Sequence, residues 1–107
     1  MWSICHLDAQ HGLIEDATAH DLSLAQQCQD DYVQHGLIPR ESFLLPSNSQ
    51  PRVITSGDLD SWTCPADGLA ATSGVVYLEE RGPFQQIAVR RFICPSTHRW
   101  SDETDGS

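Results

Sequence analysis

The sequence predicts an α+β fold in which one amphipathic helix packs on a small, mainly antiparallel sheet with a long C-terminal β-hairpin. Two observations support this fold class. Residues 19–35 carry apolar side chains at helical spacing, and residues 75–94 contain two apolar runs on either side of RGPF, a turn-forming sequence. With 107 residues, of which 39% are apolar, the chain has the size of one domain with one core. We expect residues 1–100 to form this single domain and residues 101–107 (SDETDGS) to be a disordered acidic tail.

The segment 19–35 is the clearest helix in the sequence. Thr18 and Asp21 resemble a capping box at its start, Gly36 suits its end, and Pro39 prevents it from resuming. When the segment is projected at 100° per residue, one face is polar and the other is apolar. The apolar face contains Leu22, Leu24, Ala25, Cys28, Tyr32 and Val33.

The predicted strands are short, apart from the hairpin. The sequence WSICHLD (2–8) alternates well enough for a first strand, a loop follows it, and ESFLL (41–45) and PRVIT (51–55) indicate two more strands. In the hairpin, pairing Glu80 with Gln85 places apolar side chains on both faces. Such a hairpin has to be covered on both sides, by the rest of the chain or by a partner.

Charge is unevenly distributed along the chain. The net charge is −9, with six arginines and no lysine; residues 1–39 hold six acids and no Arg or Lys, whereas residues 79–99 hold four arginines. A balance this negative repels a phosphate backbone, so we expect no direct binding to nucleic acid. An acidic surface suits a protein partner with a basic surface, although acidity also simply keeps a small protein soluble.

The sequence also indicates the compartment. It has no run of about 18 apolar residues that would span a membrane, and its start lacks the features of a signal peptide. We therefore expect a cytoplasmic protein with no membrane partner, in which Cys5, Cys28, Cys64 and Cys94 are reduced.

Two Cys-Pro pairs, at Cys64 and Cys94, bracket the hairpin in the way that the two knuckles of a zinc ribbon do. Half of each knuckle is present, because Asp67 stands where a second cysteine is usual and His98 lies one residue later than usual. Cys64, Asp67, Cys94 and His98 are thus the candidate metal ligands, with zinc as the one candidate cofactor. A Cys64–Cys94 disulfide and two ordinary buried thiols are the alternatives.

Patterns that would indicate catalysis are weak. His6, Asp8 and His11 have the residue types of a hydrolytic metal site, but such a site needs several helices to present its ligands. Cys94 and His98 form a nucleophilic dyad only if the turn between them brings them within hydrogen-bonding reach. A phosphate-binding loop is absent from the sequence. We therefore expect a protein that is not an enzyme.

The function predicted from these patterns is a non-catalytic protein-binding module that acts as a regulator, inhibitor or assembly factor. One instance is a small acidic inhibitor of a nucleic-acid-handling complex, of the kind that bacteriophages use, with carboxylates in place of phosphates. The alternative is a zinc-stabilised domain or small metalloenzyme. The predicted partner-binding residues are Glu15, Asp16, Asp30, Asp31, Arg81, Arg90, Arg91, Phe92 and Trp100.

Overall fold

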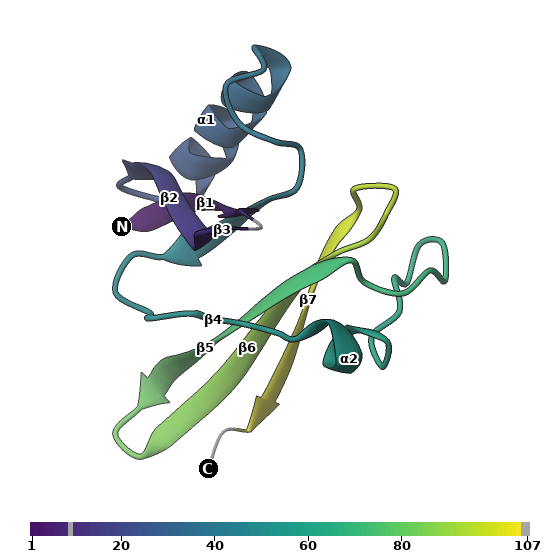
Figure 1. Cartoon of the computed structure of the whole chain (residues 1–107). Coiled ribbons are helices and arrows are strands. Elements are labelled where there is room, and N and C mark those ends of the chain that lie inside the picture. The colour runs from purple at the N-terminus through teal and green to yellow at the C-terminus, as the bar shows by residue number, and fades with distance from the viewer. Residues whose placement is uncertain (9, 106–107) are drawn as a thin grey trace. The chain divides into compact units, whose positions relative to one another are not determined.

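The computed structural model describes residues 1–8 and 10–105 and shows an α+β fold with one main helix and two antiparallel sheets (Figure 1). The predicted fold class is therefore confirmed. The chain divides into two compact units, Met1–Asn48 and the part from Ser49 onward. The first unit holds a three-stranded sheet with the main helix, and the second holds a four-stranded sheet that includes the hairpin.

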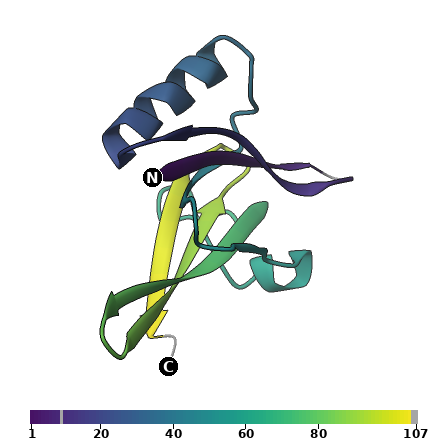
Figure 2. The ribbon, with the colours of Figure 1, turned by 90° about the vertical axis from the view of Figure 1, so that its left-hand side faces the viewer.

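In the first unit, β1 (Trp2–Asp8) lies between β2 (Gly12–Ala19) and β3 (Ser42–Pro46) and is antiparallel to both. The helix α1 (Leu22–Gln34) lies along this sheet (Figure 2). Its apolar side meets the sheet because alternate residues of the strands point toward it. The resulting core contains Ile4, Ala19, Ala25, Ile38 and Leu44.

The start and the buried face of α1 differ from the prediction. Asp21 caps the helix, because its side chain accepts a hydrogen bond from the Leu24 backbone N–H at 2.7 Å. Thr18 is instead the next-to-last residue of β2. Leu22 and Leu24 are exposed, whereas Gln29 is buried and its amide donates to the Ser42 hydroxyl at 2.8 Å. The hydrogen-bonded side chain of Gln29 is thus part of the core. Leu22 and Leu24, which the helical projection placed on the buried face, are not.

Strand β2 occupies a segment for which the sequence predicted a loop. Its pairing with β1 shifts between Ile4 and Cys5, so that Ile4 faces Ala17 and Cys5 faces Glu15, with Asp16 as the extra residue. A bulge of this kind breaks the two-residue alternation by which strands are recognised in a sequence. The alternation that would have predicted β2 from the sequence is therefore interrupted at Asp16.

The second unit is built on a long hairpin. Strands β5 (Ser73–Gly82) and β6 (Gln85–Ile93) form the centre of the sheet, with β4 (Arg52–Val53) beside β5 and β7 (Arg99–Asp105) beside β6. The short helix α2 (Ser56–Leu59) precedes β5. In the core of this unit, Phe92 packs with Leu59 and Ala71.

The hairpin register differs from the prediction by one residue. Gly82 pairs with Gln85 and Glu80 with Gln86, with an irregularity between Glu80 and Gly82. Since strand side chains alternate between faces, this shift turns β6 over relative to β5, so that Tyr77 lies opposite Val89.

The predicted disordered tail is corrected as well. Ser101–Asp105 belong to β7, which pairs with β6 from Ile87 to Ile93, and residues 106–107 lie outside the described residues. The composition of this segment favours disorder, but the segment is ordered by backbone pairing with β6 and by ion pairs such as Arg90 with Asp102. Within the described part of the chain, no helix is long and apolar enough to cross a membrane.

Candidate metal centre

The first half of the candidate site is a tight turn between α2 and β5. The Cys64 backbone N–H donates to the Leu69 carbonyl and the Gly68 N–H donates to the Cys64 carbonyl, each at 2.8 Å. Gly68 has a φ of +73°, a left-handed conformation that glycine adopts without steric cost. This turn brings Cys64 and Asp67 together.

The second half is the turn between β6 and β7. The Cys94 N–H donates to the His98 carbonyl at 3.1 Å, and the Thr97 N–H donates to the Cys94 carbonyl at 2.9 Å. Thr97 has a φ of +64°, which is uncommon for a β-branched residue and lets the chain return within four residues. Cys94 and His98 are thereby placed at the base of neighbouring strands.

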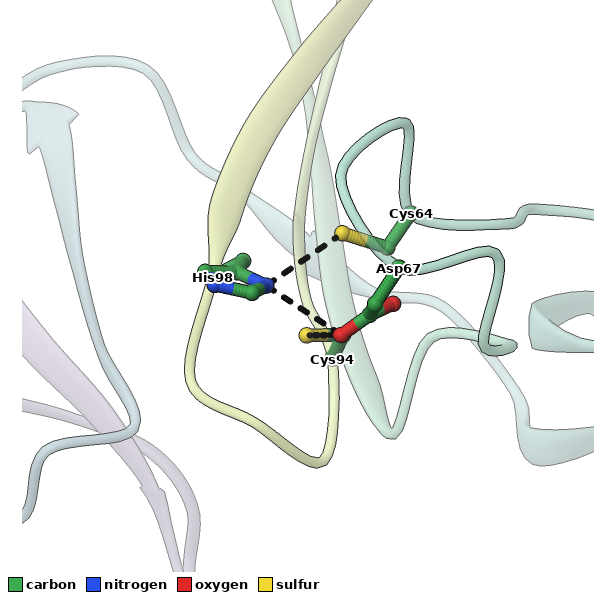
Figure 3. Close-up of side chains that lie close together, drawn as sticks. All are labelled: Cys64, Asp67, Cys94 and His98. Carbon is green, nitrogen blue, oxygen red and sulfur yellow. Dashed lines mark hydrogen bonds and ion pairs between the residues drawn. The ribbon is translucent and has the colours of Figure 1, made fainter.

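The side chains from the two turns converge (Figure 3). One potential ligand atom from each of Cys64, Asp67, Cys94 and His98 lies within 4.8 Å of the others. The His98 Nδ1 atom is 3.7 Å from the Cys64 Sγ atom and 3.2 Å from the Asp67 Oδ2 atom. The Cys94 Sγ atom is 3.3 Å from the same carboxylate oxygen.

These separations match the edges of a zinc tetrahedron. Zinc bonds are about 2.3 Å long to sulfur and about 2.0–2.1 Å long to nitrogen or oxygen. In a tetrahedron with these bonds, two nitrogen or oxygen ligands lie about 3.3 Å apart, and a sulfur and a nitrogen or oxygen ligand lie about 3.6 Å apart. The three observed separations, 3.2, 3.3 and 3.7 Å, lie within about 0.3 Å of these values. Three of the six separations among the four atoms are thus compatible with one tetrahedral ion, and the other three are at most 4.8 Å.

The Asp67 carboxylate and the Cys94 thiol differ in protonation. The Leu69 N–H donates to Asp67 Oδ1 at 3.0 Å and, with smaller contributions from the Cys94 and Cys64 thiols, lowers the pKa of Asp67 to about 2, so this carboxylate is ionised at neutral pH. Burial raises the pKa of Cys94, whose thiol donates to Asp67 Oδ2. Metal binding would replace that thiol proton.

Exposure differs across the site. Cys64 and Cys94 are 3% and 1% exposed, whereas the side chains of Asp67 and His98 are 21% and 51% exposed. The Ala66 backbone N–H also donates to Cys64 Sγ at 3.4 Å, an outer hydrogen bond that suits a metal-bound thiolate. The site is thus a buried sulfur pair covered by a carboxylate and an imidazole.

The structure brings together all four candidate ligands that the sequence singled out, although Cys64 and His98 are 34 residues apart in the chain. Within residues 1–8 and 10–105 they are the one group of three or more such side chains with this geometry. His6, Asp8 and His11 do not form such a group: His6 contacts Asp16 at 2.7 Å, and His11 contacts Asp8 at 3.4 Å.

The predicted partner-binding residues of the second unit, here called the basic patch, are largely engaged within that unit; they are Arg81, Arg90, Arg91, Phe92 and Trp100. Arg81 donates to Glu103 and Glu79, and Arg90 donates to the Thr104 hydroxyl at 2.7 Å and lies 3.7 Å from the Asp102 carboxylate. These acids come from β5 and β7, so the arginines contribute to the sheet itself.

The remaining members of the patch lie against aromatic rings. Arg91 Nε donates to the Tyr77 hydroxyl at 3.3 Å. Phe92 is fully buried between Trp62 and Trp100, with ring centroids 4.9 and 5.4 Å away. Phe92 is therefore a core residue, which corrects its assignment to a partner-binding surface, and Trp100 is partly buried against it.

Of the four predicted acidic contact residues, two have partners in the first unit. Glu15 accepts a hydrogen bond from the Ser3 hydroxyl at 2.7 Å, and Asp16 pairs with His6. Asp30 and Asp31 are exposed on α1. Those two aspartates are exposed together with other acids of the first unit, such as Glu15 and Asp21.

The thiol of Cys5 makes stability dependent on pH in the alkaline range. Burial, reinforced by Glu15 and Asp16, raises its pKa from 9.0 to about 11. Below pH 9 the thiol is protonated in both states; between pH 9 and 11 only the unfolded chain loses the proton, so the free energy of unfolding falls, by about 2 kcal/mol. Urea unfolding at pH 8 and pH 11 should show a smaller fall for Cys5→Ala than for wild type and Cys28→Ala. Equal falls in all three proteins would contradict this assignment.

Comparison with known proteins adds no further information about this centre: no protein family, curated protein or solved structure matches the chain.

Proposed function

We propose that this chain is a non-catalytic protein-binding module whose second unit is stabilised by a structural zinc ion bound to Cys64, Asp67, Cys94 and His98. The observation that supports the zinc site is the convergence of four potential ligand atoms within 4.8 Å of one another, with three of their separations close to those of a zinc tetrahedron. Two thiolates, an imidazole and a carboxylate suit zinc, whereas magnesium and calcium prefer oxygen ligands alone.

The ligand count favours a structural role over a catalytic one. Catalytic zinc sites have three protein ligands and leave the fourth position to water or substrate, whereas structural sites have four protein ligands. Here four side chains are available, and both sulfur ligands are buried. In this proposal the ion joins the turn before β5 to the turn after β6 and so fixes the open end of the hairpin, where Ser73 pairs with Ile93.

Elemental analysis tests the zinc site. Protein purified without chelator should contain about one zinc ion per chain, and Cys64→Ser should lose it. Cys28→Ser is the matched control, because Cys28 is a partly buried thiol of the first unit, and it should retain the metal. Folded wild-type protein that stays metal-free after incubation with zinc would overturn the proposal.

The binding role rests on the acidic face of α1. Asp30 and Asp31 are exposed, and α1 contains no basic residue. The first unit as a whole has seven acids against one arginine. We infer a protein partner with a basic surface, such as a component of a nucleic-acid-handling complex, met in the cytoplasm where thiols stay reduced.

Affinity capture from the native host tests this second part. A partner captured by wild type should be lost in the Asp30→Asn, Asp31→Asn double variant and weakened by raised salt, because exposed charges are screened. An Asp60→Asn, Glu80→Gln variant removes the same charge from exposed positions of the second unit and should still bind. If the amount of captured partner changes neither with the Asp30→Asn, Asp31→Asn double variant nor with salt, the acidic-face proposal is wrong.

A further inference from the structure

We propose that Cys64 and Cys94 form a disulfide when the metal is lost under oxidising conditions, and that this disulfide replaces zinc as the link between the two turns. The inference deepens the proposed function and rests on its zinc site. Both cysteines are free thiols, and their Sγ atoms lie within 4.8 Å of each other. A disulfide bond is about 2.05 Å long, so the sulfur atoms need to approach by less than about 3 Å.

The side chains of Asp67 and His98 lie beside the two sulfur atoms. Asp67 Oδ2 lies 3.3 Å from Cys94 Sγ, and His98 Nδ1 lies 3.7 Å from Cys64 Sγ (Figure 3). Both side chains reach solvent, whereas the sulfurs beneath them are buried. A bound metal ion would occupy a lone pair of each thiolate, which is the electron pair that attacks an oxidant, so the metal-free protein is the form in which the two sulfur atoms can react.

The reaction balances with a peroxide as the oxidant. The thiolate of one cysteine attacks a peroxide oxygen, the O–O bond breaks, and sulfenic acid and one water form after proton uptake. The second thiolate then attacks the sulfenic sulfur, the S–S bond forms, and the S–O bond breaks with release of a second water. Two thiolates, one hydrogen peroxide and two protons thus yield one disulfide and two waters, and two electrons pass from sulfur to oxygen.

The cross-link has a defined effect on the fold. It would join the turn before β5 to the end of β6, the same two points that the metal joins. By closing this loop, it reduces the conformational freedom of the unfolded chain. The thermal midpoint of the oxidised, metal-free protein should therefore lie above that of the reduced, metal-free protein.

Peptide mapping provides the test. Zinc-loaded and chelator-treated wild type are exposed to hydrogen peroxide, remaining thiols are alkylated, and the chain is cleaved after arginine. Cys64 then lies in the peptide 53–81 and Cys94 in the peptide 92–99. We expect these two peptides to be linked in the chelated sample. In the zinc-loaded sample the link should form at least tenfold more slowly.

Variants separate the outcomes. Cys28→Ser should still give the linked peptides, and Cys94→Ser should not. Zinc binding without the 64–94 link, or a link that involves Cys5 or Cys28 instead, overturns this inference and leaves the proposed function standing. The 64–94 link in a protein that never binds zinc overturns the proposed function, and with it the exchange between metal and disulfide.

Discussion

Chelating zinc from the protein is expected to lower the thermal unfolding midpoint of the unit from Ser49 onward by about 15–30 °C. A ligand present at about a thousand times its Kd stabilises the folded state by about 4 kcal/mol, and each kcal/mol shifts the Tm of a small unit by about 4–8 °C. Tryptophan fluorescence reports on this unit through Trp62 and Trp100 once Trp2, which belongs to the first unit, is replaced by Phe.

Cysteine variants control this experiment. Cys94→Ser should unfold at the temperature of the chelated protein and should not respond to chelator, because it lacks one ligand of the ion. Cys28→Ser should behave as wild type does. If the protein contains zinc and its Tm does not change when the zinc is removed, the ion has no structural role.

Replacing Phe92 with Ala is expected to lower the free energy of unfolding of the same unit by about 3–5 kcal/mol. Its ring is fully buried and stacks on Trp62 and Trp100. Gly74 leaves room for this ring, since a Cβ atom there would lie 2.8 Å from Phe92 Cδ1. Truncation leaves a cavity that Trp62, in the segment after α2, and Trp100, on β7, cannot fill without a shift of their backbone.

Phe84→Ala is the matched control, because Phe84 lies between β5 and β6 and its side chain is fully exposed. Its removal should change the free energy of unfolding by less than about 0.5 kcal/mol. Urea unfolding of the two variants checks this pair of expectations. Equal destabilisation by both substitutions would show that the assignment of the core to Phe92 is wrong.

The parts of the fold that could be predicted are those with local signals. The alternation in WSICHLD predicted β1, helical spacing with Gly36 after it predicted α1, and the apolar runs around RGPF predicted the β5–β6 hairpin. The two Cys-Pro pairs on either side of that hairpin placed Cys64 near Cys94, because a hairpin brings its ends together.

The parts that could not be predicted depend on how neighbouring strands pair, because a bulge or a partner strand leaves no regular pattern in the local sequence. A bulge at Asp16 interrupts the alternation of β2, so this strand was not predicted. An irregularity before Gly82 makes the hairpin register differ by one residue from the predicted one. Strand β7 is acidic in sequence and is ordered by its pairing with β6. The same pairing places Glu103 against Arg81, which is why a run of arginines that looks like an open basic patch is largely engaged within the sheet.

X-ray absorption spectroscopy at the zinc edge identifies the atoms bound to the metal. We expect two sulfur atoms at about 2.3 Å and two nitrogen or oxygen atoms at about 2.0–2.1 Å from the zinc ion. Those ligands correspond to Cys64, Cys94, Asp67 and His98. A spectrum without sulfur ligands, or with water oxygens in a six-coordinate shell, would contradict the proposed zinc site.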